Sequence, residues 1–208
     1  MSNFLINTGK KYDDLYNKSV NSPESFWDEL ASQNFIWNKK WSKVVDWDFK
    51  KANVSWFKDA KLNITINCID RHVKNTPEKT AIIFEPNDPN EKNKSFTYFE
   101  LLKEVCKIAN VLKSIGVKKG DRVCIYLPMI PELAFSVLAC ARIGAIHSVV
   151  FAGFSSQALA TRIDDCKSSL IITSDGSYRG EKTLNLKAIV DDALDICKTQ
   201  QKVLLVNR

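Results

Sequence analysis

The stretch Arg122–Phe151, RVCIYLPMIPELAFSVLACARIGAIHSVVF, contains the pattern that decides the fold. It starts with the apolar run 122–127, continues with helical spacing over 131–143, and ends with the apolar run 145–151. Runs that are almost entirely apolar are typical of strands buried on both faces, as in parallel sheets. A proline stops the first run and a glycine ends the helical segment, so the stretch predicts a strand, a helix and a second strand.

The same alternation continues toward the carboxyl end. Helical spacing covers residues 155–166 and 186–197, and apolar runs cover residues 170–173 and 202–206. Strands that alternate with helices favour a parallel sheet with helices on its faces. We therefore predict an α/β fold with a parallel sheet flanked by helices and connected by right-handed crossovers.

The part of the chain just before this stretch continues the same region. Residues 80–85 (TAIIFE) predict a strand, residues 86–94 a polar turn, and Phe96 the start of a short second strand. Residues 98–115 have apolar positions at helical spacing and end at a glycine, which predicts a helix. Together these segments give a domain that we place at residues 80–208.

Residues 1–79 have a different character. Helices are expected at 12–20, at 23–33 with Ser22 as N-cap and Pro23 at the first helical position, and at 62–74. Between them lie large aromatic residues without a clear period: Trp37, Trp41, Trp47, Phe49, Trp56 and Phe57. We interpret this part as an irregular coil that buries its rings against another domain. The alternative, stacking platforms for bases, fits poorly because the intervening lysines have no regular spacing. Residues 1–79 are thus predicted to be a mostly helical or irregular, aromatic-rich extension.

Composition and charge restrict the class of protein. The 30 basic and 24 acidic residues give a net charge of +6, with the lysines spread along the chain. This indicates a solvated surface, although a basic field also favours anionic small molecules such as nucleotides. No basic stripe interleaved with aromatics points to nucleic acid. No apolar run has the length of a membrane span or a secretory signal, so we expect a cytoplasmic protein.

The residue types that carry metal or nucleophilic chemistry are scattered. The 6 cysteines form no C-x-x-C pair, and the 2 histidines lack a partner at metal-ligand spacing, so no metal site is predicted. Asp164–Asp165 and Asp191–Asp192 are neighbours on helices, where adjacent side chains point apart. Sequence motifs of phosphate-binding loops, dinucleotide folds, serine hydrolases and zinc proteases are absent, and no catalytic residue is assigned.

Two loops that follow predicted strands are candidate binding segments, because ligands of open α/β sheets bind at the carboxyl ends of the strands. The first contains Ala152, Gly153 and Phe154, followed by Ser155 as a helix cap. Gly153 allows close approach of a ligand or a positive φ. The residues alone leave open whether this is a binding loop or a tight strand-to-helix turn.

The second loop, residues 174–182, contains Arg179, Gly180, Glu181 and Lys182. A guanidinium fork and an ammonium group at this spacing suit phosphate oxygens. The competing interpretation is a polar surface loop whose cations pair with the neighbouring acidic residues. Taken by itself, the pattern indicates a soluble α/β domain with an anion-binding loop as one of two alternatives.

The strings themselves resemble a known family. The segment from YLPMIPELAFSV through FAGFSSQALATRIDDC to SLIITSDGSYRGEKTLNLK resembles the acetyl-CoA synthetases, which belong to the adenylate-forming acyl-CoA ligase superfamily. NCIDRHV, SFTYFELLKEV and the aromatic-rich leader with SPESFWDE and VSWFKDAKLNITINC fit the same family. The resemblance covers residues 12–208 and is most specific over residues 128–187.

This resemblance implies an AMP-forming acetate–CoA ligase. Acetate and ATP, with Mg²⁺ on the ATP, give acetyl-adenylate and pyrophosphate, and the thiol of coenzyme A then displaces AMP. Arg179, Gly180, Glu181 and Lys182 match the loop that holds the nucleotide end of coenzyme A, and Ala152, Gly153 and Phe154 match a loop near its pantetheine tunnel. At position 182 the family varies between Arg and Lys, and Lys182 keeps the charge but cannot make a bidentate contact. At position 152 the family often has Gly, so Ala152 allows a less close approach to the backbone.

The resemblance also implies what is absent. The adenylation loop, the acetate pocket and the Mg²⁺ site of the family fall outside these 208 residues, which are expected to be inactive without the remainder of the enzyme. A propionate–CoA ligase is the nearest rival, although SLIITSDG and residues 178–182 favour the acetate branch. A non-catalytic binding module is the rival from another class.

Overall fold

The computed structural model describes residues 5–180 and 182–208, with Arg179 described through its backbone only. The chain divides into two compact units, residues 1–67 and 68–208. This division falls before the boundary at residues 79 and 80 suggested by the sequence, because Ile69 and the residues around it pack into the core of the second unit.

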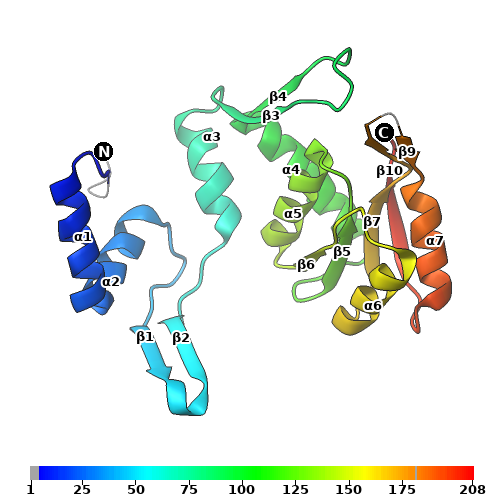
Figure 1. Cartoon of the computed structure of the whole chain (residues 1–208). Coiled ribbons are helices and arrows are strands. Elements are labelled where there is room, and N and C mark those ends of the chain that lie inside the picture. Colours follow the sequence, from blue (N-terminus) through cyan, green and yellow to red (C-terminus); the bar gives the residue numbers. More distant parts are fainter. Residues whose placement is uncertain (1–4, 181) are drawn as a thin grey trace. The chain divides into compact units, whose positions relative to one another are not determined.

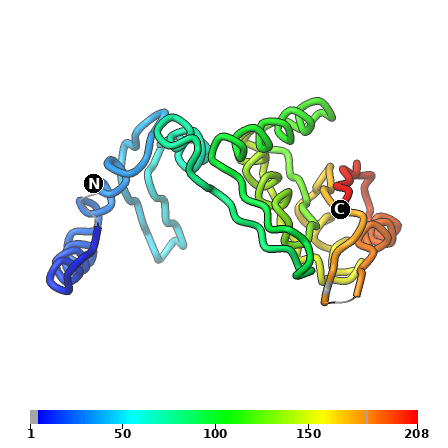
Figure 2. Tube along the Cα trace, turned by 90° about the horizontal axis from the view of Figure 1, so that it is seen from above, coloured from blue at the N-terminus to red at the C-terminus, as the bar shows by residue number. Residues whose placement is uncertain are grey.

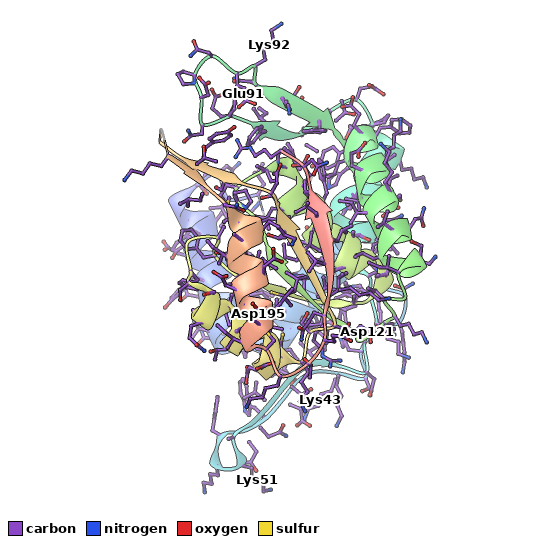
Figure 3. All side chains as sticks on the ribbon, turned by 90° about the vertical axis from the view of Figure 1, so that its right-hand side faces the viewer. Lys43, Lys51, Glu91, Lys92, Asp121 and Asp195 are labelled. Atoms are coloured by element: carbon purple, nitrogen blue, oxygen red, sulfur yellow. The ribbon has the colours of Figure 1, made fainter. Side chains whose placement is uncertain are left out.

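The first unit contains two helices and a β-hairpin. Helices α1 (Gly9–Asn21) and α2 (Pro23–Asn34) confirm the two expected helices. Strands β1 (Lys43–Asp48) and β2 (Asn53–Lys58) pair antiparallel, and Figure 3 shows Lys51 at the tip of this hairpin. The prediction of an irregular coil is therefore wrong for this segment.

The aromatic rings of the first unit pack on one another. The ring centroids of Trp37 and Trp41 are 5.0 Å apart, and those of Trp41 and Phe57 are 4.9 Å apart. The indole of Trp37 donates to the carbonyl of Ala31 at 2.9 Å, and that of Trp41 to Asp28 Oδ1 at 2.8 Å. These contacts attach the hairpin to α2, as expected for rings with a polar N–H that requires a partner.

The second unit is built on a parallel sheet, which confirms the predicted fold class. Its strands are β5 (Arg122–Tyr126), β6 (Ile146–Val149), β7 (Leu170–Ser174) and β10 (Lys202–Val206), in the order β10-β7-β5-β6. Alternate residues of β5 point to opposite faces, since Val123 and Ile125 join one buried cluster while Cys124 and Tyr126 join another. The two central strands, β5 and β7, are therefore buried along almost their whole length, because both faces of the sheet are covered there.

Helices lie on both faces of the sheet (Figure 1). One face packs against α4 (Tyr98–Ser114) and α5 (Pro131–Ile143), and the other against α6 (Ser156–Cys166) and α7 (Leu186–Ile196). The start of α4 is fixed by a capping box, in which Thr97 Oγ1 accepts the N–H of Glu100 and Glu100 Oε2 accepts the N–H of Thr97.

Two short hairpins and a helical segment complete the unit. Strands β3 (Thr80–Phe84) and β4 (Lys94–Thr97) pair antiparallel and lie outside the parallel sheet. A π-helical turn, Ile66–Asp70, leads into α3 (Arg71–Asn75), where one helix was expected. Strands β8 (Ser177–Arg179) and β9 (Lys182–Leu184) also pair antiparallel, so the segment predicted to be a loop is a small hairpin.

Labelled residues mark the two ends of the parallel strands in Figure 3. In Figure 3, Glu91 and Lys92 lie near the end of the β3–β4 hairpin, whereas Asp121 and Asp195 mark the opposite, amino end of the parallel strands. Figure 2 shows the β3–β4 connection reaching toward the β8–β9 hairpin, which follows the carboxyl end of β7.

The helices of the described residues include none with the length and apolar character of a membrane span.

Candidate functional site: a cavity at the carboxyl ends of the strands

A cavity of about 400 Å³ lies at the carboxyl ends of the parallel strands. Segments that follow all four strands of the sheet reach it: Met129 follows β5, Gly153 follows β6, Tyr178 follows β7 and Arg208 follows β10. Phe84, Glu85 and Asn87, from the end of β3 and the connection beyond it, complete its wall. A cavity in this position is the arrangement in which open α/β sheets bind ligands.

The strand order explains why the cavity is there. From β5 the chain crosses through α5 to β6 on one side, and then through α6 to β7 on the other side of β5. The connections therefore separate between β5 and β7, which leaves a crevice outside their carboxyl ends. One candidate loop follows β7, which borders this crevice, and the other follows β6, the neighbour of β5.

The first predicted loop contributes two of its three residues to the cavity. Ala152 and Gly153 line it. Phe154 instead contacts α6, where the centre of its ring lies 4.5 Å from the guanidinium carbon of Arg162. Gly153 does not adopt a positive φ. Its missing side chain instead makes room for the ring of Phe151, because a Cβ at position 153 would lie 2.4 Å from Phe151 Cε1.

The helix that follows this loop begins as expected. Ser155 Oγ accepts the N–H of Ala158 at 3.3 Å, which caps α6. The turn is therefore a strand-to-helix connection that also forms part of the cavity wall, and its role in ligand binding stays a prediction.

The second predicted loop lies at the turn of the β8–β9 hairpin. Arg179 pairs with Lys182 across the turn, and Gly180 between them has φ +60°. Glu181 and the side chain of Arg179 lie outside the described part of the structure. Lys182 is exposed, and Tyr178 and Leu184 of the two strands line the cavity.

A long-range hydrogen bond connects this turn with the other wall of the cavity. Asn87 Nδ2 donates to the carbonyl oxygen of Gly180 at 3.1 Å, across 93 positions of sequence. The β3–β4 connection and the β8–β9 turn are thereby held together at one edge of the site. The composition of the polar turn at 86–94 gave no sign of this role.

Arg208 is a site residue that the sequence did not indicate. Its guanidinium carbon lies 4.8 Å from the centre of the Tyr178 ring, and its backbone N–H donates to Asp175 Oδ1 at 3.1 Å. A cation stacked on an aromatic face forms a flat surface with positive charge. The sequence feature that indicates this role is its position, because Arg208 follows β10 and therefore lies at the carboxyl end of the parallel sheet.

Beneath the cavity, Tyr126 is fully buried on β5. Its hydroxyl lies 2.8 Å from the carbonyl oxygen of Phe154 and 3.3 Å from that of Ala152, and it donates to the nearer one. Burial raises the pKa of Tyr126, so the group keeps its proton at neutral pH. Sequence reasoning treated this tyrosine only as part of an apolar strand.

The described residues that line the cavity include no cysteine. Burial, together with the nearby Cys166 and Cys197, raises the pKa of Cys124 to about 12, and burial raises that of Cys140 to about 11. Thiols with such values stay protonated at neutral pH. Among the described residues, no group of three or more His, Cys, Asp or Glu side chains could hold a metal ion.

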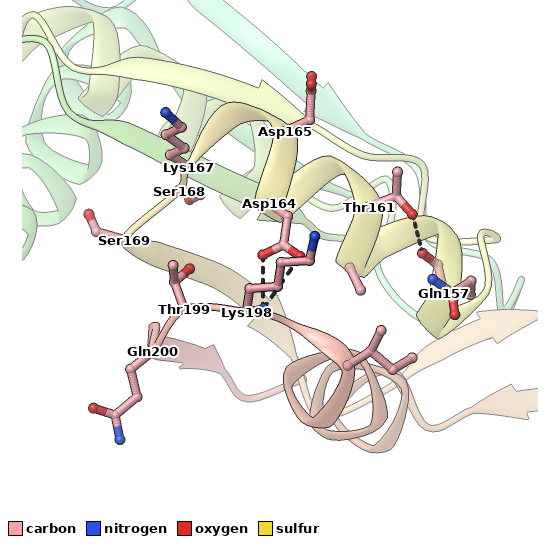
Figure 4. Close-up of a pocket in the computed structure, with 12 residues that line it drawn as sticks. Gln157, Thr161, Asp164, Asp165, Lys167, Ser168, Ser169, Lys198, Thr199 and Gln200 are labelled. Atoms are coloured by element: carbon pink, nitrogen blue, oxygen red, sulfur yellow. Dashed lines mark hydrogen bonds between the residues drawn. The ribbon is translucent and has the colours of Figure 1, made fainter.

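A larger hollow of about 790 Å³ lies at the opposite, amino end of the sheet (Figure 4). It is bounded by the ends of α6 and α7, where Asp164 accepts the backbone N–H of Lys198 at 3.2 Å. The carboxylate is thus occupied in joining two helix ends. No predicted site residue lies there, so its size does not make it the functional site.

Comparison with known proteins places the chain in a family. The family described as AMP-binding enzyme matches residues 69–207, and the family described as acetyl-coenzyme A synthetase N-terminus matches residues 12–68. The chain belongs to the AMP-binding enzymes. The two matches meet at the point where the structure divides into its two units, which assigns the aromatic hairpin unit to the amino-terminal segment.

Among relatives of this chain are proteins named acetyl-coenzyme A synthetase. The protein of that name from Leptospira biflexa is 54% identical over 186 residues, which are 89% of this chain and 28% of the relative. The one from Saccharophagus degradans is 48% identical over 207 residues, 100% of this chain and 32% of the relative. The chain thus spans about a third or less of these relatives.

A solved structure shares the fold. Acetoacetyl-CoA synthetase from Streptomyces lividans superposes with a TM-score of 0.85 at 23% identity, over 97% of this chain and 30% of that chain. At this identity the similarity establishes the fold of the chain and nothing finer.

Proposed function

We propose that this chain is the amino-terminal part of an AMP-forming acetate–CoA ligase and that it contributes part of the coenzyme A site. The relatives named acetyl-coenzyme A synthetase, at 46% to 54% identity, support the ligase assignment. The observation that carries the site assignment is that both predicted loops flank one cavity at the strand ends.

The cavity has the chemistry that coenzyme A requires. Its nucleotide end is rich in phosphate; Arg208 lines the cavity, and the adjoining β8–β9 hairpin carries two further cationic residues, Arg179 and Lys182. Its pantetheine arm is less polar, and Met129, Phe151 and Gly153 offer an apolar wall. The fit is to an elongated anionic ligand with a less polar arm.

The chain's own residues have a binding role in this proposal. Bound coenzyme A would supply the thiol that displaces AMP from acetyl-adenylate. Arg179 and Lys182 hold its phosphates, and the Ala152–Gly153 backbone guides the arm toward the interior. ATP, its Mg²⁺ and acetate are assigned to the rest of the ligase, and the segment by itself is proposed to be inactive.

The test uses a chimera that joins residues 1–208 to the downstream part of the Leptospira biflexa relative. In it, Arg179→Gln and Lys182→Gln are combined, which removes two charge-assisted contacts. We expect the KM for coenzyme A to rise about 10- to 100-fold, because each such contact contributes roughly 1.5–3 kcal/mol before solvent screening. Acetate-dependent pyrophosphate exchange, which needs no coenzyme A, should stay within about twofold of the parent.

A matched control carries the same loss of charge elsewhere. Lys167→Gln with Lys198→Gln lies at the amino end of the sheet, beside the other hollow, and should leave both measurements unchanged. If pyrophosphate exchange collapses as strongly as coenzyme A use in the Arg179/Lys182 variant, the site assignment is wrong. A preference of the chimera for propionate over acetate would not bear on this segment, because the acyl pocket is assigned to the downstream part.

A further inference from the structure

The loop between β6 and α6 forms a wall of the cavity, and its shape depends on few contacts. Inside the loop, the N–H of Phe154 donates to the carbonyl of Phe151 at 3.0 Å, which closes a tight turn. The rings of Phe151 and Phe154 meet edge to face with centroids 5.9 Å apart. Phe151 is 70% exposed, so this contact provides little anchoring to the core.

The anchor to the core comes from a different strand. Tyr126 reaches from β5 to the carbonyl oxygens of Ala152 and Phe154, which bracket Gly153 on both sides. A tyrosine with 0% exposure has no water as an alternative partner, so its hydroxyl stabilises only the loop conformation that presents these carbonyls. The turn is thereby attached to β5, a strand that is buried from Val123 to Tyr126.

A hydroxyl is required here for a physical reason. A phenylalanine would fill the same apolar volume between β5, α6 and α7, so the packing of the core does not select tyrosine. Only the hydroxyl distinguishes the two residues, and its described partners are the two loop carbonyls. The choice of residue therefore serves the position of the loop rather than the core.

We propose that Tyr126 is a positioning residue of the coenzyme A site, whose hydroxyl fixes the Ala152–Phe154 backbone in the position in which the cavity accepts the arm of the carrier. This rests on the proposed function. Tyr126 does not itself line the cavity, so it acts through the loop. The acetate-activating half of the reaction does not depend on it.

The test is Tyr126→Phe, measured in two ways. In the 208-residue chain, hydrogen exchange of the Ala152–Phe154 amides should become about fivefold to tenfold faster, while the thermal midpoint changes little. In the chimera described above, the KM for coenzyme A should rise about fivefold, with pyrophosphate exchange unchanged. Tyr98→Phe is the matched control, since Tyr98 lies away from the cavity and stacks on His72.

The outcomes separate the inference from the function on which it rests. Unchanged exchange of the loop amides, or an unchanged KM for coenzyme A while the Arg179/Lys182 variant raises it, would overturn the role of Tyr126 alone. Equal losses in both half-reactions with a lowered thermal midpoint would also overturn it, because they indicate a structural role. If neither Tyr126→Phe nor the Arg179/Lys182 variant alters coenzyme A use, the proposed function fails as well.

Discussion

Gly180 has φ +60° in the turn between β8 and β9, a conformation that L-residues with a Cβ adopt at a cost. No heavy atom lies within 4 Å of where its Cβ would be. A substitution there adds backbone strain without a steric clash. Its effect therefore measures how much the conformation of the turn that carries Arg179 and Lys182 matters.

We expect Gly180→Ala to weaken this turn by about 1 kcal/mol and to raise the KM for coenzyme A in the chimera roughly fivefold. Gly180→Asn should have a smaller effect, because Asn tolerates the left-handed region. Gly9→Ala is the control, since Gly9 also has open space but no positive φ, at the start of α1. Equal KM values for the Ala and Asn variants would show that backbone strain at this turn is unimportant.

At the scale of single residues, the sequence identified the cationic turn and the glycine loop but not the groups that hold them. Arg179, Lys182 and Gly153 stood out by residue type within short segments. Asn87 and Tyr126 act through hydrogen bonds to positions far along the chain, and no local pattern contains such a contact. Residue type alone therefore suggested which residues contact a ligand, whereas the hydrogen bonds that support them could be found only from the folded structure.

Between elements, the ion pair of Asp70 and Arg142 joins the π-helical turn before α3 to α5. The guanidinium makes two parallel bonds of 2.9 Å to the two carboxylate oxygens. The hydrogen bond from Arg142 is the main cause that lowers the pKa of Asp70, against the opposing effect of burial. The pair is about a third exposed, so solvent screens part of its strength.

Replacing Asp70 by Asn should lower the free energy of unfolding at neutral pH by about 1–2 kcal/mol, after allowance for screening. Because the folded-state pKa of Asp70 lies below the ordinary value of 3.8, its contribution is full above that value. As the pH falls below 3.8 through the lowered pKa, the carboxylate is protonated and the difference between parent and variant should disappear. Urea unfolding followed by far-ultraviolet circular dichroism at neutral and acidic pH measures it.

Glu104→Gln is the control for this prediction, since Glu104 pairs at 2.7 Å with Lys107 of the same helix, whose side chain is 58% exposed. Its removal should change stability little at either pH. A stability loss for Asp70→Asn that persists undiminished in acid would contradict the assignment of the effect to the ionised pair.

The elements that the sequence predicted well are those with a long, simple pattern. The alternation from β5 to β10 follows from apolar runs and helical spacing, which reflect burial on both faces of a sheet. The β1–β2 hairpin was missed although Val45 and Trp47, and Val54 and Trp56, alternate with polar residues as strands do. The six aromatic residues of the whole segment have no common period, which obscures the period of two within each strand. Strands β8 and β9 have three residues each, too few for any pattern to indicate.

At the scale of the whole molecule, the described sheet ends in two strands that each have one neighbour, β6 and β10. Ile146 and Val149 of β6 are 55% and 51% exposed, and Leu205 of β10 is 42% exposed. Apolar side chains next to unpaired strand edges favour association. In the proposed ligase, the remainder of the enzyme is expected to cover such surface.

We therefore expect the purified 208-residue chain to self-associate, as measured by light scattering after size-exclusion chromatography. Ile146→Lys combined with Val149→Lys should shift it toward the monomer, because charges on an edge strand oppose pairing. Val111→Lys on α4, which is 40% exposed in the parent, is the control and should not. A monomeric parent with a sharp, cooperative melt would contradict this expectation.

All 5 tryptophans of the chain, Trp27, Trp37, Trp41, Trp47 and Trp56, belong to the hairpin unit. Their emission on excitation of the indoles therefore reports on that unit alone, and the parallel-sheet unit is spectroscopically silent at those wavelengths. A tryptophan placed at an exposed position such as Phe151, beside the cavity, would give the second unit its own optical signal. The two units could then be followed independently in one sample.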